Sequence, residues 1–408
     1  MWNSRGLAPA AVVVAGGGIV GLSVAFELAR RRVDVLVLER RRIGAGAAGV
    51  AAGMLSPASE AEHATPALTR LAQESQHRYP DWVHAVEETS GVDCGLRQEG
   101  TLLVALGRDD EDELARIAQF QARLGIAAEW LTAQQVRTLE PQLSPRVTAA
   151  LCAPHDHQVN PQATLEALHR AIVALGGRIV EGAAVDGFEI EGGRLYGVTG
   201  RHAALEDAGA LRAASGSLPG SLPAVAGKLV GERLTVGCEV AVLAAGAWSS
   251  QDLAWPAAPL GVRPVKGQLL HLQGPDLIRH VVRTPAVYLV PRHGGRLVVG
   301  ATMEEQGFDA TPTAGAVMDL LWSARLVVPG MYDLALADVR VGFRPATRDH
   351  APIIGATAIA GLHVATGHFR HGVLLAPATA TMLADELLGG APSPLLAPFR
   401  PQRGAVSA

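Results

Sequence analysis

Three glycines near the N-terminus have the spacing of a turn that binds a nucleotide phosphate. In "AGGGIVG", Gly16, Gly18 and Gly21 follow a short β-branched run and open a helical pattern. Such glycines permit a tight turn, a close approach of the backbone to a pyrophosphate and close packing of helix on strand. Glu39 ends the next predicted strand about twenty residues later, where a carboxylate binds ribose hydroxyl groups. The pattern predicts a dinucleotide site; the alternative is a structural turn with a surface glutamate.

The segment after Glu39 favours FAD over NAD. It reads "RRRIGAGAAGVAAGMLSP", and a loop of such small residues lets the backbone follow a large cofactor closely. The arginines at 40–42 could pair with the phosphate of NADP, but the carboxylate of Glu39 would repel that phosphate. We therefore expect FAD, with these arginines at a solvated rim.

A loop near the C-terminus separates a strand pattern from a helix pattern. In "ATGHFRHGVLLAPATATMLADELL", Gly367 ends an apolar run and the helix begins near Gly372. Reduced flavin carries negative charge on its pyrimidine side, which the dipole and free N–H groups of a helix N-terminus stabilise. His368 and His371 could instead bind a metal or transfer protons, but the pattern offers no third ligand. We expect backbone contacts with the flavin and no metal.

Arg344 is the candidate for binding an anionic substrate. It stands in "GFRPATRD". A planar guanidinium holds a carboxylate through two parallel charge-assisted hydrogen bonds, which fixes the orientation of the bound group as lysine could not. The alternative is a surface arginine before Pro345.

The elements that must position these residues begin with a βαβ unit. Buried strands are predicted at 12–15 and 33–39, with a helix at 19–31 between them. Helical spacing follows at 62–90 and 109–140, and the stretch 95–106 between them is typical of a short strand pair. A further helix, Gln162 to Leu175, ends at two glycines that favour a left-handed stop.

The rest of the chain is mostly strand. We expect strands joined by a Gly-rich turn at 178–200, a buried strand that runs into a glycine turn at 239–248, an all-β region at 264–302, and a strand and closing helix from 341 onward. Residues 201–232 are rich in Ala, Gly, Ser and Pro, and predict a mobile surface insertion to which no function is assigned. The predicted fold class is α/β. A Rossmann-type FAD-binding domain is expected at 9–90, 155–262 and 341–395, and a β-rich substrate domain at 91–154 and 263–340.

Composition excludes several classes of protein. The chain has 408 residues, 49% of them apolar, a net charge of −4 and a pI near 6.4, which argues against nucleic acid or an anionic membrane as partner. Cys94, Cys152 and Cys238 form no CxxC motif and fit buried thiols in a reducing cytoplasm. The apolar N-terminal stretch is interrupted by four glycines and Glu27, which favours strand–turn–helix over a signal peptide. We expect a cytoplasmic protein.

Five motifs in order resemble the ThiO-type glycine oxidases of the D-amino acid oxidase family of FAD-dependent amine oxidases. They are "GGGIVGLSVAFELARR", "GVAAGMLSPASEAE", "VYLVPRHGGRLVVGATMEEQGFD", "GFRPATRDHAPIIG" and "ATGHFRHGVLLAPATA". The similarity covers about residues 10 to 390 except the insertion. It implies oxidation of glycine, and of sarcosine or small D-amino acids, to the imine and glyoxylate, with ammonia and hydrogen peroxide. It also implies a role in thiazole synthesis for thiamine and a homo-oligomer, commonly a tetramer.

The resemblance also assigns site residues. It makes Arg344 the carboxylate-binding arginine and Tyr288 the residue that closes the pocket, brings Arg370 to the substrate side, and places Met54 and Met303 in the pocket wall. Core packing is the alternative for Tyr288 and both methionines. The residues expected to contact FAD, bound non-covalently, are Gly16, Gly18, Ile19, Val20, Gly21, Glu39, Arg40, Ala47, Ala48, Ala52, Gly53, Met54, Val185, His368, Phe369, Arg370, His371, Gly372, Val373 and Leu374. The family usually has Asn at the position of His371, which leaves that contact open.

No catalytic base is required by this chemistry. If the amine binds uncharged, the α-hydrogen can leave as hydride to the flavin, and catalysis is mainly orientation. Two other functions stay open at this point: a dehydrogenase relative with another electron acceptor, and a flavin-binding or RNA-modifying relative. The acidic pI disfavours RNA, and Arg344 would be idle in a pure binding module.

Overall fold

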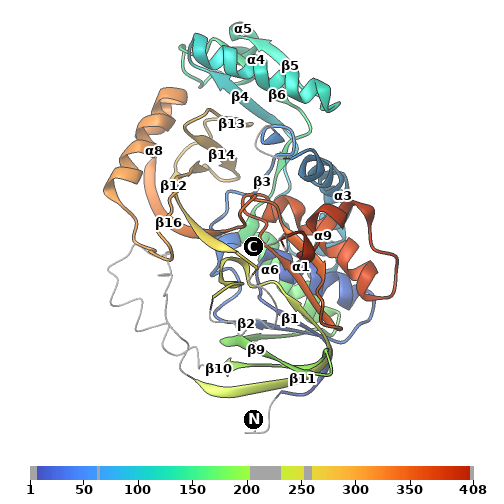
Figure 1. The fold of residues 1–408 in the computed structure, drawn as a ribbon. Coiled ribbons are helices and arrows are strands. Elements are labelled where there is room, and N and C mark those ends of the chain that lie inside the picture. Colours follow the sequence, from blue (N-terminus) through green and yellow to red (C-terminus); the bar gives the residue numbers. More distant parts are fainter. Residues whose placement is uncertain (1–6, 62–64, 203–230, 252–259, 405–408) are drawn as a thin grey trace.

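The computed structural model describes residues 7–61, 65–202, 231–251 and 260–404. Their strands form two eight-stranded sheets and one two-stranded sheet; the larger sheets occupy the lower and upper parts of the molecule in Figure 1. The first sheet has the order β17-β18-β11-β1-β2-β8, and β10 and β9 extend it from β11. Its strands are β1 (Ala10–Ala15), β2 (Val35–Glu39), β8 (Arg178–Glu181), β9 (Ala183–Glu191), β10 (Arg194–His202), β11 (Glu232–Leu243), β17 (Ile353–Ala356) and β18 (Leu362–Thr366).

The centre of the first sheet is parallel and buried on both faces. β1 pairs in parallel with β2 and β11, and β11 with β18, as apolar runs without alternation predict. Val12 and Val14 face a helical layer, whereas Val13 packs with residues of β10 and β11 on the other face. The helices of that layer are α1 (Ile19–Arg30), α3 (Pro66–Ser90), α6 (Pro161–Ala174) and α9 (Gly372–Leu387). This is the predicted α/β architecture, and the fold class is confirmed.

The second sheet joins segments that lie far apart in the sequence. Its order is β16-β12-β15-β14-β13-β4-β6-β5, and the parallel pair β13–β4 links its two halves. Its strands are β4 (Thr101–Ala105), β5 (Glu129–Thr132), β6 (Ala149–Ala153), β12 (Arg263–Gln273), β13 (Val281–Arg283), β14 (Tyr288–Arg292), β15 (Arg296–Gly300) and β16 (Ala335–Ala346). The helices α4 (Arg108–Arg123), α5 (Ala133–Leu139) and α8 (Ala314–Val327) pack on it.

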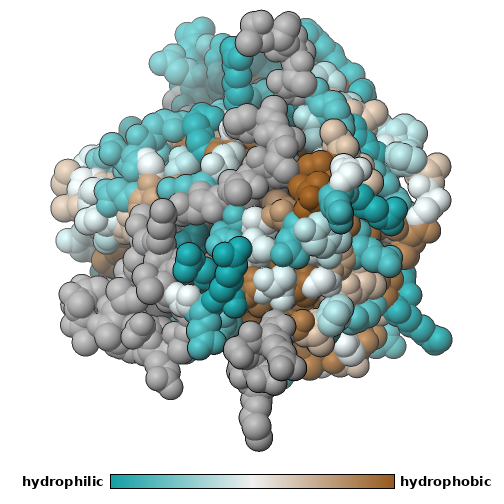
Figure 2. Space-filling view, turned by 60° about the horizontal axis from the view of Figure 1, so that its bottom comes forward, coloured by the Kyte–Doolittle hydropathy of each residue, from teal (hydrophilic) through white to brown (hydrophobic). Residues whose placement is uncertain are grey.

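Short elements complete the described chain. They are α2 (Ala47–Val50), the strand pair β3 (Met54–Leu55) and β7 (His157–Gln158), and the 3₁₀ turns η3 (Gly246–Trp248), η4 (Pro329–Asp333), η5 (Pro394–Phe399) and η6 (Pro401–Gly404). No helix of the described residues is long and apolar enough to cross a membrane. The face turned forward in Figure 2 carries hydrophilic and hydrophobic residues intermixed.

Four details of the sequence prediction are wrong. The helical stretch 109–140 is two helices separated by Gly125, whose φ of 67° ends the first, and by β5. The stretch 95–106 holds one strand, β4, which pairs with β6 and β13 rather than within the stretch. The strand expected from residue 239 is β11, which begins earlier, at Glu232, and ends at Leu243 before the expected glycine turn at Gly246, whose φ is 54°. Residues 341–346, predicted with the nucleotide-binding segments, continue β16 of the second sheet.

Of the helical stretch expected at 62–90, residues 62–64 lie outside the described residues, and α3 begins at Pro66. The other expected strands and helices are found within a few residues of their predicted bounds. Gly176 follows α6 with a φ of 86°, which is the left-handed helix stop that was expected. Gly192 and Gly193 form the turn between β9 and β10, with φ of 57° and 77°. The insertion predicted at 201–232 lies mostly outside the described residues. At its edges, residues up to His202 belong to β10 and residues from Glu232 to β11.

Candidate active site

A cavity of about 1120 Å³ lies between elements of the two sheets. It exceeds the roughly 300–1,000 Å³ typical of drug-sized ligands, and is therefore large enough for an extended cofactor and a small substrate. Its walls include the turn after β1, the segment after β2, the loop before α9, and the strands β12, β14 and β16.

The glycine turn has the geometry that its spacing predicts. Gly16 has a φ of 120°, and a Cβ there would lie 2.4 Å from the carbonyl oxygen of Ala244. A Cβ on Gly21 would lie 2.0 Å from the carbonyl oxygen of Gly16, so this glycine lets α1 pack against the turn. A Cβ on Gly18 would meet no protein atom within 4 Å. The turn thus leaves open space at Gly18, next to the N-terminus of α1, where anions bind favourably.

Glu39 lies at the cavity as predicted, and its carboxylate is ordered by the backbone. It accepts hydrogen bonds from the N–H groups of Gly17 at 2.7 Å and Arg41 at 2.9 Å. Burial raises the pKa of Glu39 despite these two bonds, which favour the ionised form. The guanidinium groups of Arg40 and Arg41 lie 5.0 and 5.9 Å from the ring centre of Trp248. These arginines are therefore packed at the cavity wall, not at a fully solvated rim as the sequence suggested.

The loop before α9 is held in an unusual backbone conformation. Gly367 has a φ of 72° and Phe369 a φ of 48°, in a left-handed region that residues other than glycine rarely adopt. The N–H of Phe369 donates to the carbonyl of Pro345 at 2.9 Å, and its ring stacks on His350 with centroids 4.3 Å apart. The loop is thereby tied to the end of β16, immediately beyond Arg344.

The two histidines of this loop have different partners. His368 is buried, its Nε2 lies 3.1 Å from the hydroxyl of Thr379 in α9, and burial followed by the charge of His371 lowers its pKa to about 3. The Nδ1 of His371 lies 3.5 Å from a carboxylate oxygen of Glu60. Among the described residues, no group of three or more His, Cys, Asp or Glu side chains could hold a metal ion.

Two strand glycines provide the space for the predicted substrate residues. A Cβ on Gly267 of β12 would lie 2.4–2.6 Å from the guanidinium atoms of Arg344, so this side chain lies flat over the glycine. A Cβ on Gly300 of β15 would lie 2.5 Å from the ring and hydroxyl of Tyr288. Burial lowers the pKa of Arg344 and raises that of Tyr288. No carboxylate of the described residues pairs with Arg344, which leaves its charge for an anionic ligand.

The same end of the cavity contains two charged residues that the sequence did not single out. Glu60 and Arg283 both line it, and Glu60 accepts from Arg283 at 3.0 Å. Glu60 ends a turn at 57–60. The fully buried Asp156 fixes this turn by accepting from the N–H groups of Ala58 and Ser59 at 3.0 and 2.9 Å. Glu60 stands in the motif "GVAAGMLSPASEAE", so its place in that motif could have identified it as a site residue from the sequence.

Most of the predicted residues line the cavity. Those that do are Gly16, Gly18, Ile19, Val20, Glu39, Arg40, Ala47, Ala48, Ala52, Gly53, Met54, Val185, Tyr288, Arg344, His368, Phe369, Arg370, Gly372 and Val373. Gly21, His371, Leu374 and Met303 do not line it. Met303 is 58% exposed, and its sulfur lies 3.5 Å from Arg370 Nη2. Met303 therefore contacts Arg370 and does not form part of the cavity wall, where it was expected.

The residues present fit FAD. Two helix N-termini, those of α1 and α9, begin beside one cavity, and each offers N–H groups that have no partner within its own helix. The open side of Gly18 and the carboxylate of Glu39 lie in the same cavity. None of the three cysteines lines it.

Comparison with known proteins supports FAD as the cofactor. Residues 11–386 match the DAO family, described as FAD dependent oxidoreductase. The glycine oxidase of Geobacillus kaustophilus is 32% identical over 381 residues, which cover 92% of each chain. The bifunctional protein ThiO/ThiG of Trichormus variabilis is 32% identical over 96% of this chain, which spans 55% of that protein, or about half its length.

Solved structures give the same relationship. The crystal structure of glycine oxidase from Geobacillus kaustophilus superimposes with a TM-score of 0.85 at 30% identity and covers 98% of this chain. That from Bacillus cereus gives a TM-score of 0.82 at 28% identity. The resemblance to glycine oxidases predicted from the five motifs is confirmed. The chain belongs to the DAO family of FAD-dependent oxidoreductases, and FAD is its cofactor.

Proposed function

We propose that this protein is a glycine oxidase. The observation that carries the proposal is Arg344, a cation with no carboxylate partner among the described residues, which lies over Gly267 in the wall of the FAD cavity. In the proposed reaction glycine, dioxygen and water give glyoxylate, ammonia and hydrogen peroxide. Sarcosine and small D-amino acids are further substrates in this proposal.

The chain's own residues bind and orient the substrate. Arg344 takes the carboxylate through two charge-assisted hydrogen bonds, and Tyr288 closes the pocket beside it. Arg370, on the loop before α9, faces the same cavity from the cofactor side. Bound FAD supplies the acceptor for the two electrons removed from the substrate carbon–nitrogen unit. Fixing the carboxylate sets the position of the α-carbon, so orientation is the main contribution of these side chains.

The cofactor is held without a covalent bond in this proposal. The glycine turn and the N-terminus of α1 bind its pyrophosphate, and Glu39 binds ribose hydroxyl groups. The N-terminus of α9 at Gly372 and Val373 faces its flavin end. The absence of a cysteine from the cavity wall supports this mode of binding.

The setting of the reaction also follows from the relatives. We propose that the product imine serves thiazole synthesis for thiamine, because the chain matches the proteins named ThiO/ThiG over 96% of its length. We propose a cytoplasmic homotetramer on the motif resemblance. The three free thiols, none of them in a disulfide, are consistent with a reducing compartment.

Oxygen consumption by the FAD-loaded protein tests the proposal. Glycine, sarcosine and D-alanine are supplied in turn, and peroxide and ammonia are measured together with oxygen. We expect equal amounts of oxygen consumed and peroxide formed with glycine. Turnover that proceeds with an artificial acceptor under nitrogen, but with no oxygen uptake in air, would identify a dehydrogenase instead.

A further inference from the structure

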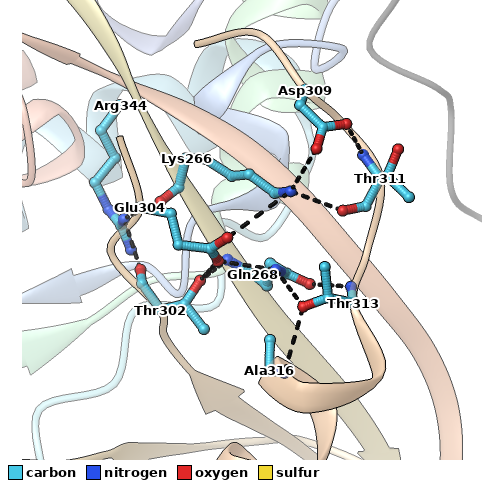
Figure 3. A network of polar contacts seen from close by, with 9 residues as sticks. All are labelled: Lys266, Gln268, Thr302, Glu304, Asp309, Thr311, Thr313, Ala316 and Arg344. Atoms are coloured by element: carbon cyan, nitrogen blue, oxygen red, sulfur yellow. Dashed lines mark hydrogen bonds and ion pairs between the residues drawn. The ribbon is translucent and has the colours of Figure 1, made fainter. Parts of the chain in front are cut away.

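A buried lysine fastens the segment after β15 to the back of the substrate site. Lys266, on β12, is one of only two lysines in the chain, and its side chain is 1% exposed. Its Nζ donates to the carbonyl of Thr311 at 2.7 Å and to Asp309 at 3.3 Å, and lies 3.9 Å from Glu304 (Figure 3). A buried ammonium is costly unless its three N–H groups have partners, and these three oxygens lie in one segment, 304–311.

Gln268 fastens the same segment two residues further along the strand. Its amide nitrogen donates to Glu304 at 2.8 Å and to Thr313 at 3.2 Å, and its oxygen accepts from the N–H of Thr313 at 2.9 Å. Lys266 and Gln268 share one face of β12, because side chains alternate along a strand. Gly267 and Leu269 line the cavity on the opposite face. On one face of β12, Lys266 and Gln268 thus hold the segment 304–313. On the opposite face, Gly267 leaves the space that the guanidinium of Arg344 occupies.

Thr302 connects this network to Arg344. Its N–H donates to the carbonyl of Gln268 at 3.1 Å, and its hydroxyl accepts from the N–H of Gln268 at 2.9 Å and donates to Glu304 at 2.5 Å. With these groups fixed, its carbonyl accepts from Arg344 Nη1 at 3.0 Å, and the carbonyl of Lys266 lies 3.5 Å from the same nitrogen. Figure 3 shows Arg344 reaching this carbonyl from the neighbouring strand.

We propose that Lys266, Gln268 and Glu304 are positioning residues for Arg344, which they hold through Thr302. The carbonyl of Thr302 occupies one guanidinium nitrogen and fixes the plane of the group, so that its other N–H groups face the cavity in a single orientation. A bidentate bond to a carboxylate depends on that plane. The inference rests on the proposed role of Arg344 as carboxylate ligand.

Binding of glycolate tests the proposal, because glycolate has the carboxylate of glycine and no amine to oxidise. The FAD-loaded protein is titrated with glycolate, and its dissociation constant is read from the change in flavin absorbance. For Glu304→Gln and Thr302→Val we expect a rise of roughly tenfold in this constant and in the KM for glycine. The FAD dissociation constant should stay at its wild-type value.

Glu140→Gln is the matched control. Glu140, at the end of α5, is a buried carboxylate that accepts from the N–H groups of Arg279 and His280 at 2.9 and 2.7 Å, and it does not line the cavity. The two donors precede β13 of the same sheet. The loss of this carboxylate should lower the Tm as much as Glu304→Gln does, with no change in glycolate binding.

Lys266→Met should weaken glycolate binding. Lys266→Arg keeps the positive charge and should bind glycolate as the wild type does. Thr302→Val keeps the test open if Lys266→Met does not fold.

The outcomes separate this inference from the proposed function. Unchanged glycolate binding in Glu304→Gln and Thr302→Val, or an equal loss in Glu140→Gln, would overturn the positioning role. If the wild type binds glycolate but does not oxidise glycine, the proposed substrate is wrong and the positioning role is still measured on glycolate. If it binds no carboxylate at all, both are wrong.

Discussion

At the scale of single residues, the substrate site depends on two glycines, whose lack of a side chain leaves room for the neighbouring residues. Arg344 lies over Gly267 and Tyr288 over Gly300 at distances that leave no room for a Cβ. We expect Gly267→Ala to displace the guanidinium and raise the KM for glycine by one to two orders of magnitude, because misplacement of about 1 Å has such effects. Steady-state kinetics of the FAD-loaded variant measure this. Gly315→Ala, at an exposed helix position with open space around it, is the control and should keep wild-type kinetics.

Removal of Arg344 is the more direct change. Arg344→Ala should weaken substrate binding by about 3–5 kcal/mol, the loss expected when a buried carboxylate has no partner. Arg348→Ala removes an exposed arginine four residues away and should leave the KM for glycine unchanged. A wild-type KM in Arg344→Ala would show that another group binds the carboxylate.

The sequence reveals some of these residues and hides others for a physical reason. Glu39 and the glycine turn follow from local spacing, and Arg344 from its chemistry. Gly267 and Gly300 carry no turn signal, since both lie within or at the end of strands, and their role depends on which side chain crosses them. Glu60 and Arg283 are 223 residues apart, so only the fold brings their charges together.

At the scale of elements, the strand–turn–helix unit separates packing from cofactor binding. A Cβ on Gly21 would overlap the carbonyl of Gly16, whereas one on Gly18 would meet no protein atom within 4 Å. Gly21→Ala should therefore lower the Tm of the FAD-free protein and also weaken FAD binding. Gly18→Ala should keep that Tm and weaken FAD binding alone. Thermal unfolding and FAD titration of both variants check this, and equal Tm losses would contradict it.

Helix α9 is anchored through a histidine that stays neutral. The pKa of His368 is lowered to about 3 from an ordinary 6.5, so below pH 6.5 the unfolded chain takes up a proton that the folded chain does not. The free energy of unfolding should fall by about 1.4 kcal/mol per pH unit from this group as the pH drops from 6.5 towards 3. His368→Gln, which can still reach Thr379, should flatten the dependence of Tm on pH in this range. His77→Gln, at an exposed position, should keep the wild-type slope.

Element boundaries were predictable where local chemistry sets them. The buried strands and α6 follow from apolar runs and glycine stops. The stretch 109–140 has helical spacing throughout, but pairing of β5 with β6 draws Glu129–Thr132 into the second sheet. Tertiary pairing overrides the local pattern there. β16 crosses the expected domain boundary for the same reason, because β12 pairs with it from Arg263 to Gln273.

At the scale of the whole molecule, the cavity takes its walls from both large sheets, so FAD binding should stabilise the whole fold. A ligand that binds only the folded state adds about 2.7 kcal/mol at a free concentration 100 times its dissociation constant. We expect a single unfolding transition whose Tm rises steadily with added FAD. Two transitions, of which FAD moves one, would show that the two sheets unfold independently.

The visible spectrum of the FAD-loaded protein, recorded under nitrogen before and after addition of glycine, tests the central claim most directly. The account predicts that glycine bleaches the oxidised flavin band, and that air restores the band with formation of hydrogen peroxide. Arg344→Ala, loaded with FAD to the same extent, should bleach only at much higher glycine concentration. A wild-type flavin band that glycine leaves unchanged at every concentration would contradict the assignment of glycine as substrate.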